Sequence, residues 1–382
     1  MDAHSRTPLP ISVVITVFNR AELLERALRS IASQRPRGPA EVIVVDDAST
    51  DGSGEVAEAA GARVIRHERN LGTGVGKQTG LMAARHEWVA LLDSDDEWLP
   101  EHLGILWSLT PGHVLVASAC IECNPDSSER GFHGVLREET EILTSPAHLL
   151  HPENPIPDSA VMIHRDTALA AGGFRDVFCE DLDMWCRLLD PGRGALSPKV
   201  GLRYYTHAGQ MSADWEGVHD AHLQIARSHA AERWWSSRLV ERRRGVTAWD
   251  RFRAQQRNGT RGAFRRFLQE LLAHPQRVRG VVDVCSHRIA VRRRASRLGL
   301  GGGPSIAVLS GGDTAAIREE DRYEVDLSAA GPIEAFLCLL RRPSAVAVVS
   351  SRPQAALARL AGVRPVRSSD LGRGSRAEAA TI

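Results

Sequence analysis

Short apolar runs and helical patterns alternate along the first hundred residues. The runs are rich in β-branched and aliphatic side chains, which predicts four buried strands, at residues 11–18, 41–47, 62–65 and 88–92. Apolar spacing and capping residues predict three helices between them, at residues 22–31, 49–60 and 77–84. Because helices separate the strands, we expect an α/β fold with a parallel sheet and helices on its faces.

This kind of pattern continues to about residue 215 and then changes. Further apolar runs predict strands at 114–118, 160–163 and 199–205, and a helix at 182–189. Residues 216–300 predict a helix-rich extension, in which arginine and tryptophan are frequent. We expect the first domain to span residues 8–215.

A glycine-rich stretch at 299–304 predicts a linker to a last, smaller part of the chain. Beyond it, strands at 306–309 and 345–349 and a helix at 333–340 predict a small α/β module over residues 304–367. The composition of residues 368–382 is typical of a disordered tail.

Composition indicates a globular protein without a membrane span. Of the 382 residues, 43% are hydrophobic and 25% are charged. Residues 1–10 lack the apolar core of a signal peptide, and no run approaches the ~20 apolar residues that a membrane span needs. We therefore expect a cytoplasmic location. Cys120 and Cys123 have CxxC spacing, but no second pair completes a zinc site, so we interpret them as reduced thiols on a strand.

Charge is unevenly distributed along the chain. Residues 233–297 contain 18 arginines and only four acidic residues, although the whole chain has a net charge of +1. A solvated helical face explains this segment most simply. Peripheral contact with anionic lipid at the inner membrane face is an alternative, because aromatic residues are interleaved with the arginines: Trp234, Trp235, Trp249, Phe252, Phe264 and Phe267. Contact with an acceptor or a protein partner, including a homodimer, stays open, whereas no nucleic-acid motif accompanies the charge.

Acidic residues crowd the end of the predicted strand at 88–92. The sequence there continues as Asp93-Ser94-Asp95-Asp96, and three acids within four residues repel one another unless a cation lies among them. Hard oxygen ligands suit Mg²⁺ or Mn²⁺. Phe18-Asn19 and Asp46-Asp47 also follow predicted strands, and ligands of such sheets bind beyond the carboxyl ends of the strands. The alternative for the acidic run is a solvated turn before a helix that opens near residue 100.

Several of these segments are motifs of a known family. In chain order they are Val17-Phe18-Asn19-Arg20, residues 45–53, Arg69-Asn70-Leu71-Gly72, residues 76–80 and residues 92–96. Gly172-Gly173-Phe174 and residues 180–188 follow later in the chain. Together they resemble glycosyltransferase family 2, whose members are inverting enzymes of the GT-A fold. The resemblance covers roughly residues 10–215.

The resemblance implies a binding site for a nucleotide-sugar donor. It assigns nucleotide binding to residues of the first strands and the acidic run, namely Thr16, Val17, Phe18, Asn19, Asp47, Lys77, Asp93 and Asp95. Phe18 stands where the family usually has tyrosine, which keeps a ring and loses a hydroxyl. Asp47 would accept the N3–H of uracil. Lys77 stands where many relatives carry arginine, so a point charge replaces a bidentate fork.

The resemblance also implies a metal site and a catalytic base. Asp95, Asp96 and His207 would hold Mn²⁺ or Mg²⁺, although His207 could equally be structural. Asp181 would take the proton of the acceptor, and Glu180 would orient Asp181 or contact the acceptor. We interpret Trp185 and Arg187, on the same predicted helix, as structural.

These expectations combine into one functional hypothesis. We expect a metal-dependent inverting glycosyltransferase that moves a single sugar, from UDP-sugar as the first choice of donor, to a peptide, metabolite or glycan whose identity the sequence does not give. The absence of a spanning segment argues against a synthase that exports its polysaccharide. A nucleotidyltransferase and a catalytically silent sugar-nucleotide-binding or scaffold protein are the alternatives.

Overall fold

The computed structural model describes residues 7–134, 138–150, 154–207, 210–211, 214–230, 236–258, 260 and 262–285, together with three short strands beyond residue 303. Contacts divide the chain into two compact units, Met1–Gly303 and Pro304–Ile382. The predicted boundary near residue 215 falls inside the first unit and stays a prediction.

Ten strands of the described residues form one sheet in the first unit. They are β1 (Leu9–Val17), β2 (Pro39–Asp46), β3 (Arg63–Arg66), β4 (Trp88–Leu91), β5 (Glu97–Trp98), β6 (Leu115–Cys123), β7 (Glu129–His133), β8 (Glu141–Leu143), β9 (Val161–His164) and β10 (Gly194–Tyr205). The main path runs β3-β2-β1-β4-β9-β6-β10-β5, with β7 beside β6 and β8 beside β10. Every strand that the apolar runs predict up to residue 205 is present.

The expectation of a parallel sheet holds for only part of it. Strands β3, β2, β1 and β4 pair in parallel. Strand β9 is antiparallel to both β4 and β6, so it runs in the opposite direction to its two neighbours. The apolar run at 160–163 marks a buried strand but carries no information on its direction, because both faces of β9 are covered.

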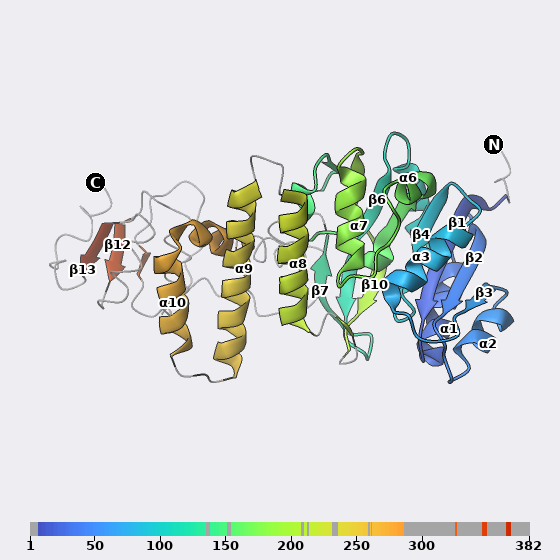
Figure 1. The fold of residues 1–382 in the computed structure, drawn as a ribbon, viewed down its shortest axis with the longest axis horizontal. Coiled ribbons are helices and arrows are strands. Elements are labelled where there is room, and N and C mark those ends of the chain that lie inside the picture. The colour runs from blue at the N-terminus through green and yellow to red at the C-terminus, as the bar shows by residue number, and fades with distance from the viewer. Residues whose placement is uncertain are drawn as a thin grey trace. The chain divides into compact units, whose positions relative to one another are not determined.

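Helices cover both faces of this sheet (Figure 1). Helices α1 (Ala21–Ala32), α2 (Ser53–Ala59) and α4 (His102–Ser108) contribute to one apolar core, and α3 (Thr73–Ala83), α6 (Arg165–Ala170) and α7 (Glu180–Leu189) contribute to the other. A short helix, α5 (Ala147–Leu150), and one 3₁₀ turn, η1 (Asp158–Ala160), lie between β8 and β9 in the chain. The alternation of strand and helix read from the sequence is confirmed.

Helix α3 packs very closely because glycines line the sides that face its neighbours. A Cβ atom at Gly80 would lie 2.3 Å from Cγ1 of Val14 on β1, and one at Gly74 would lie 2.4 Å from the carbonyl oxygen of Arg175. Glycine weakens an isolated helix, which is why the sequence predicts a start only near residue 77. Here tertiary packing extends the helix back to Thr73 and holds the loop before α7 against it.

The described residues after the sheet in the first unit include helices α8 (Trp215–Ala230), α9 (Ser236–Arg257) and α10 (Ala263–Ala273). Trp249 and Phe252 of α9 are buried against Phe267 of α10, and the two phenylalanine rings stack with centroids 4.8 Å apart. These three rings form a core between helices, so the lipid contact considered for them would require the helices to separate. Trp234 and Trp235 lie outside the described residues. Among the helices described, none has the length and apolarity needed to cross a membrane.

The second unit is described only in its strands. Strand β12 (Val346–Val349) falls where a strand is predicted and pairs in parallel with β11 (Val325–Asp326) and β13 (Arg364–Arg367). The predicted strand at 306–309, the helix at 333–340, the linker at 299–304 and the tail at 368–382 lie outside the described residues. Cys120 and Cys123 are buried, unpaired thiols on β6, as the sequence predicts.

Candidate active site

Three carboxylates gather where the chain leaves β4. Asp93, Asp95 and Asp96 each place one oxygen so that all three oxygens lie within 4.8 Å of one another. Asp96 is fully buried; it accepts hydrogen bonds from the Tyr205 backbone N–H (3.0 Å) and the Ser159 hydroxyl (2.5 Å). Burial, reinforced by the charges of Asp95 and Asp93, raises the pKa of Asp96 well above its ordinary value. Burial also raises the pKa of Asp93.

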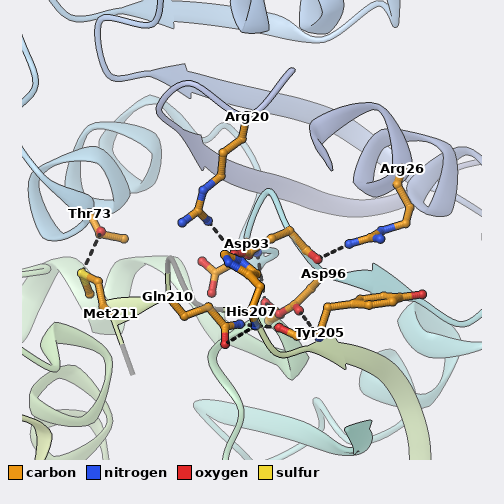
Figure 2. Close-up of polar contacts among 11 residues, drawn as sticks. Arg20, Arg26, Thr73, Asp93, Asp96, Tyr205, His207, Gln210 and Met211 are labelled. Carbon is orange, nitrogen blue, oxygen red and sulfur yellow. Dashed lines mark hydrogen bonds and ion pairs between the residues drawn. The ribbon is translucent and has the colours of Figure 1, made fainter. Parts of the chain in front are cut away.

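Basic side chains converge on Asp95, and Figure 2 shows Arg20, Arg26 and His207 around Asp93 and Asp96. Arg20 Nη1 lies 2.5 Å and His207 Nε2 lies 2.8 Å from the same oxygen, Oδ2 of Asp95. Arg26 donates to the Asp95 carbonyl and lies 3.7 Å above the centre of the Tyr205 ring. The structure thus brings His207, which is more than 100 residues away in sequence, to the acidic run.

The chemistry of this group fits a divalent cation. Carboxylate oxygens with a neighbouring imidazole nitrogen are ligands that Mn²⁺ and Mg²⁺ sites use. Burial and, after it, the charges of neighbouring carboxylates raise the pKa values of Asp93 and Asp96. A bound dication would relieve this repulsion.

The ends of β1 and β2 provide an exposed ring and two ordered loops. The Phe18 side chain is 44% exposed, although it follows a buried strand. Asn19 accepts a hydrogen bond from the Thr50 backbone N–H (2.8 Å) and so ties the β1 end to the β2 end. Val17 is buried, and its carbonyl accepts from the Asp47 N–H. The Thr16 side chain lies against α3, where Gly76 leaves room for it.

Asp47 orders the loop that precedes α3. Its carboxylate accepts from the backbone N–H groups of Leu71 (2.9 Å) and Gly72 (2.8 Å), and Oδ1 lies 2.6 Å from His67 Nδ1. If Asp47 also accepts the N3–H of uracil, as predicted, its carboxylate has to do so while it accepts these backbone hydrogen bonds. That contact stays a prediction.

Lys77 lies on α3 and has its partners on α7 and η1. Its buried ammonium forms ion pairs with Glu180 Oε1 (2.7 Å) on α7 and with Asp158 on η1. Burial alone would lower the pKa of Lys77, but these two carboxylates hold it well above the ordinary value. Lys77 therefore belongs, in the structure, with the residues predicted for catalysis.

Asp181 stands beside this ion pair, in the first turn of α7. Burial, followed by the charge of Glu180, raises the pKa of Asp181 to about 6. A carboxylate that titrates near neutrality can both exist as the base and accept a proton at physiological pH. Cys179, the residue immediately before α7, has a positive φ of 60°, which turns the chain sharply into the helix.

Arg187 and Trp185, which we interpret from the sequence as structural, have partners within the protein. Arg187 Nη2 pairs with Asp183 at 2.8 Å, one helical turn away, and the Trp185 side chain is fully buried against Phe174. Asp183 also lies 3.7 Å from His229 of α8, so this face of α7 joins the sheet to the helical extension.

Comparison with known proteins identifies the part of the chain that carries the acidic run. Residues 12–157 match the sequence model of the family described as "Glycosyl transferase family 2". Residues 12–157 form a family 2 glycosyltransferase domain. This confirms the family that the sequence motifs predict.

Curated relatives share the glycosyltransferase domain over different lengths. The succinoglycan biosynthesis protein ExoO of Rhizobium meliloti is 36% identical over 96 residues, 24% of this chain and 27% of that protein. The amylovoran biosynthesis glycosyltransferase AmsE of Erwinia amylovora is 27% identical over 193 residues, 47% of this chain and 70% of that protein. The match to ExoO therefore spans about a quarter of that protein's length.

A solved structure shows the fold of the glycosyltransferase domain. S. aureus TarS (residues 1–349), crystallised with UDP-GlcNAc, is 20% identical and superposes with a TM-score of 0.50 over 75% of this chain and 83% of that one. The likeness confirms the predicted GT-A fold.

The sequence motifs include most of the side chains of the candidate site. They do not include several residues that form hydrogen bonds or ion pairs with those side chains. Arg20 was part of a motif without a role, and Arg26, Asp158 and Ser159 were not singled out. Asp158 and Ser159 fall in a proline-rich stretch just beyond the residues that match the family. An isolated Asp-Ser pair carries no pattern, so only the fold could reveal them.

Proposed function

We propose that this protein transfers a sugar, with inversion, from a nucleoside-diphosphate sugar to an acceptor hydroxyl with the help of a divalent cation. One observation carries the proposal: Asp181, a carboxyl whose pKa is raised to about 6 by burial and then by the charge of Glu180, is also influenced by the charge of Asp93, at the start of the acidic run in the family 2 domain. We infer that a base and a site for the leaving group, the two halves of a displacement reaction, lie near each other.

The donor half is formed by the ends of β1 and β4. Asp95, Asp96 and His207 are the residues that would hold Mn²⁺ or Mg²⁺, and Arg20 adds a positive charge beside them. The bound cation would offset negative charge on the departing nucleoside diphosphate. Phe18 offers an exposed ring on which a base can pack.

The acceptor half is formed by the start of α7. Asp181 accepts the proton of the acceptor hydroxyl as the new bond to the anomeric carbon forms and the bond to the diphosphate oxygen breaks. Glu180, which is paired with Lys77, raises the pKa of the neighbouring Asp181, and a more basic carboxylate is a better proton acceptor. Backside attack in a single step inverts the anomeric configuration.

Choice of substrate follows from the relatives as a starting point. UDP-GlcNAc is the donor to test first, because it is the ligand in the TarS structure. A glycan is the acceptor class to test first, because ExoO and AmsE are named for the biosynthesis of polysaccharides.

The test is release of the leaving group from a panel of sugar nucleotides with Mn²⁺. Slow liberation of UDP from UDP-GlcNAc or another UDP-sugar, accelerated by glycan acceptors and stopped by EDTA, is the expected result. Release of sugar 1-phosphate, with transfer of the nucleoside monophosphate, would instead indicate a nucleotidyltransferase. Tight binding of UDP without turnover on any donor would indicate a silent binding protein.

A further inference from the structure

The 3₁₀ turn η1 lies between the two halves of the site. It packs against β4, β6 and β10 of the sheet. Ser159 and Ala160 are buried, and the Trp98 indole N–H donates to the Ser159 carbonyl at 2.7 Å. The backbone of this turn is thus fixed to the centre of the sheet.

Ser159 connects the turn to the donor half. Its hydroxyl donates to Asp96 Oδ2 at 2.5 Å and accepts from the Asp93 backbone N–H at 3.1 Å. One hydroxyl therefore fixes both the carboxylate of Asp96 and the backbone where the acidic run begins.

Asp158 connects the same turn to the acceptor half. Its Oδ2 pairs with the ammonium of Lys77, which in turn pairs with Glu180, the neighbour of Asp181. The other oxygen of Asp158, Oδ1, is buried and has no hydrogen-bond partner among the described residues. A buried carboxylate with an unsatisfied oxygen is costly, so a purely stabilising role explains it poorly.

We propose that the turn Asp158–Ala160 couples the two halves of the site: Ser159 is a positioning residue for the metal-binding carboxylates, and Asp158, through Lys77, is a positioning residue for the catalytic base. The inference rests on the proposed function, because it assigns positioning roles to residues next to the proposed donor site and the proposed base. Two adjacent residues on one rigid turn set the separation between leaving group and base, which an in-line displacement requires to be accurate.

The two residues should have separable effects. Ser159→Ala is expected to weaken Mn²⁺-dependent UDP binding about tenfold, because a ligand loses the hydrogen bond that orients it. Asp158→Asn is expected to leave UDP binding within about twofold while lowering kcat about 100-fold, because the base is displaced. Calorimetry with UDP and Mn²⁺ and the UDP-release assay measure the two effects. Ser108→Ala and Asp166→Asn, at exposed positions, are matched controls.

The pH profile separates positioning from general damage. Glu180, Lys77, Asp93 and Asp158 are the charged groups that act on Asp181. Asp158→Asn removes a negative charge and leaves Lys77 more effective, so the acid limb of kcat/KM should move to lower pH. Lys77→Met removes the positive charge, so the limb should move to higher pH. Shifts in opposite directions are not expected from loss of folding.

Lys77→Met could unfold the protein, because it leaves the buried carboxylates of Asp158 and Glu180 without their cation. The double variant Lys77→Gln/Asp158→Asn removes one of these two carboxylates as well and should recover part of the melting temperature lost by Lys77→Met. It should not recover turnover, because Glu180 and Asp181 stay without the lysine. Recovery of turnover together with stability would show that the pair is only structural and overturns the inference.

Two further outcomes distinguish failure of the inference from failure of the proposed function. Equal losses of UDP affinity and turnover in Ser159→Ala and Asp158→Asn, or limbs that do not move, would overturn the inference while the wild-type activity, and with it the proposed function, stands. A wild-type protein that neither binds UDP with Mn²⁺ nor releases it would overturn the proposed function, and the inference with it.

Discussion

Two groups of ionisable side chains in the first unit differ in the ratio of acidic to basic residues. In the site cluster (Asp93, Asp95, Asp96, Asp158, Glu180 and Asp181), acids lie next to acids, and burial raises the pKa of Asp96, Asp158 and Asp181. In the extension cluster (Glu241, Asp250, Glu270 and Asp283), each acid has a basic partner: Arg277, His219, Arg277 and Arg279, respectively.

Glu241 shows the difference most clearly. Burial alone would raise its pKa, yet hydrogen bonds and charges from Arg277 and Arg244 hold the pKa below the ordinary value. A carboxylate with a lowered pKa contributes stability at neutral pH, whereas one with a raised pKa costs stability there. The site therefore differs from the arginine-rich extension less in the number of charged residues than in their balance, because its acidic residues outnumber their basic partners.

The largest effect is expected from the acidic run. Asp96→Ala should weaken Mn²⁺-dependent UDP binding by at least about 100-fold, because a metal ligand is lost in addition to the bonds that orient it. Titration calorimetry with and without Mn²⁺ measures this. Asp126→Asn, at an exposed turn, is the control. Undiminished binding by Asp96→Ala would remove the metal from this position.

The next effect is expected at the base. Asp181→Asn should lower turnover by roughly 10²–10⁴-fold, because an amide cannot take the proton of the acceptor. UDP affinity should stay within about twofold, since Asp181 is not among the donor ligands. Steady-state rates and UDP calorimetry on the same preparation check both parts, and wild-type turnover would exclude Asp181 as the base.

A smaller effect is expected from pH alone. The Asp181 carboxyl has a pKa of about 6 and must be ionised to act, so kcat/KM should fall as pH drops through about 6. The stability contribution of this group has the opposite sign: its raised pKa means that protonation below pH 6 favours the folded state. Initial rates at saturating Mn²⁺ from pH 5 to 8, beside melting curves, should show activity and stability moving apart. A flat rate profile would contradict the assignment.

The smallest effect is expected in the extension. Glu241→Gln should lower the free energy of unfolding by about 1 kcal/mol through the loss of charged hydrogen bonds and leave the kinetics of UDP release unchanged. Arg29→Ala, which breaks an exposed pair with Glu25, is the reference and should change stability by less than about 0.5 kcal/mol. A fall in kcat for Glu241→Gln would mean that the extension takes part in catalysis.

The sequence predicted the fold well where burial decides it. Strands such as β1, β2 and β4 are buried on both faces and read as continuous apolar runs, which few other structures permit. Strand direction at β9 and the start of α3 at Thr73 were missed, because both depend on which segments pack together rather than on local pattern.

The candidate site divides in the same way. Motifs named Asp95, Asp96, His207, Glu180 and Asp181, and the fold brings the first three together at one place and the last two together at another. Lys77 was expected beside the nucleotide, whereas its partners are Glu180 and Asp158. Ion pairs of this kind join residues 80 to 100 positions apart and leave no spacing to read.

The glycine face of α3 sets a rule for building chimaeras of this protein. One added methyl group at Gly80 would strike Val14, and one at Gly74 would strike the backbone of Arg175, so neither neighbour can change independently of the helix. A design that imports a new donor preference from a relative therefore has to transplant β1, α3 and the loop before α7 as one block.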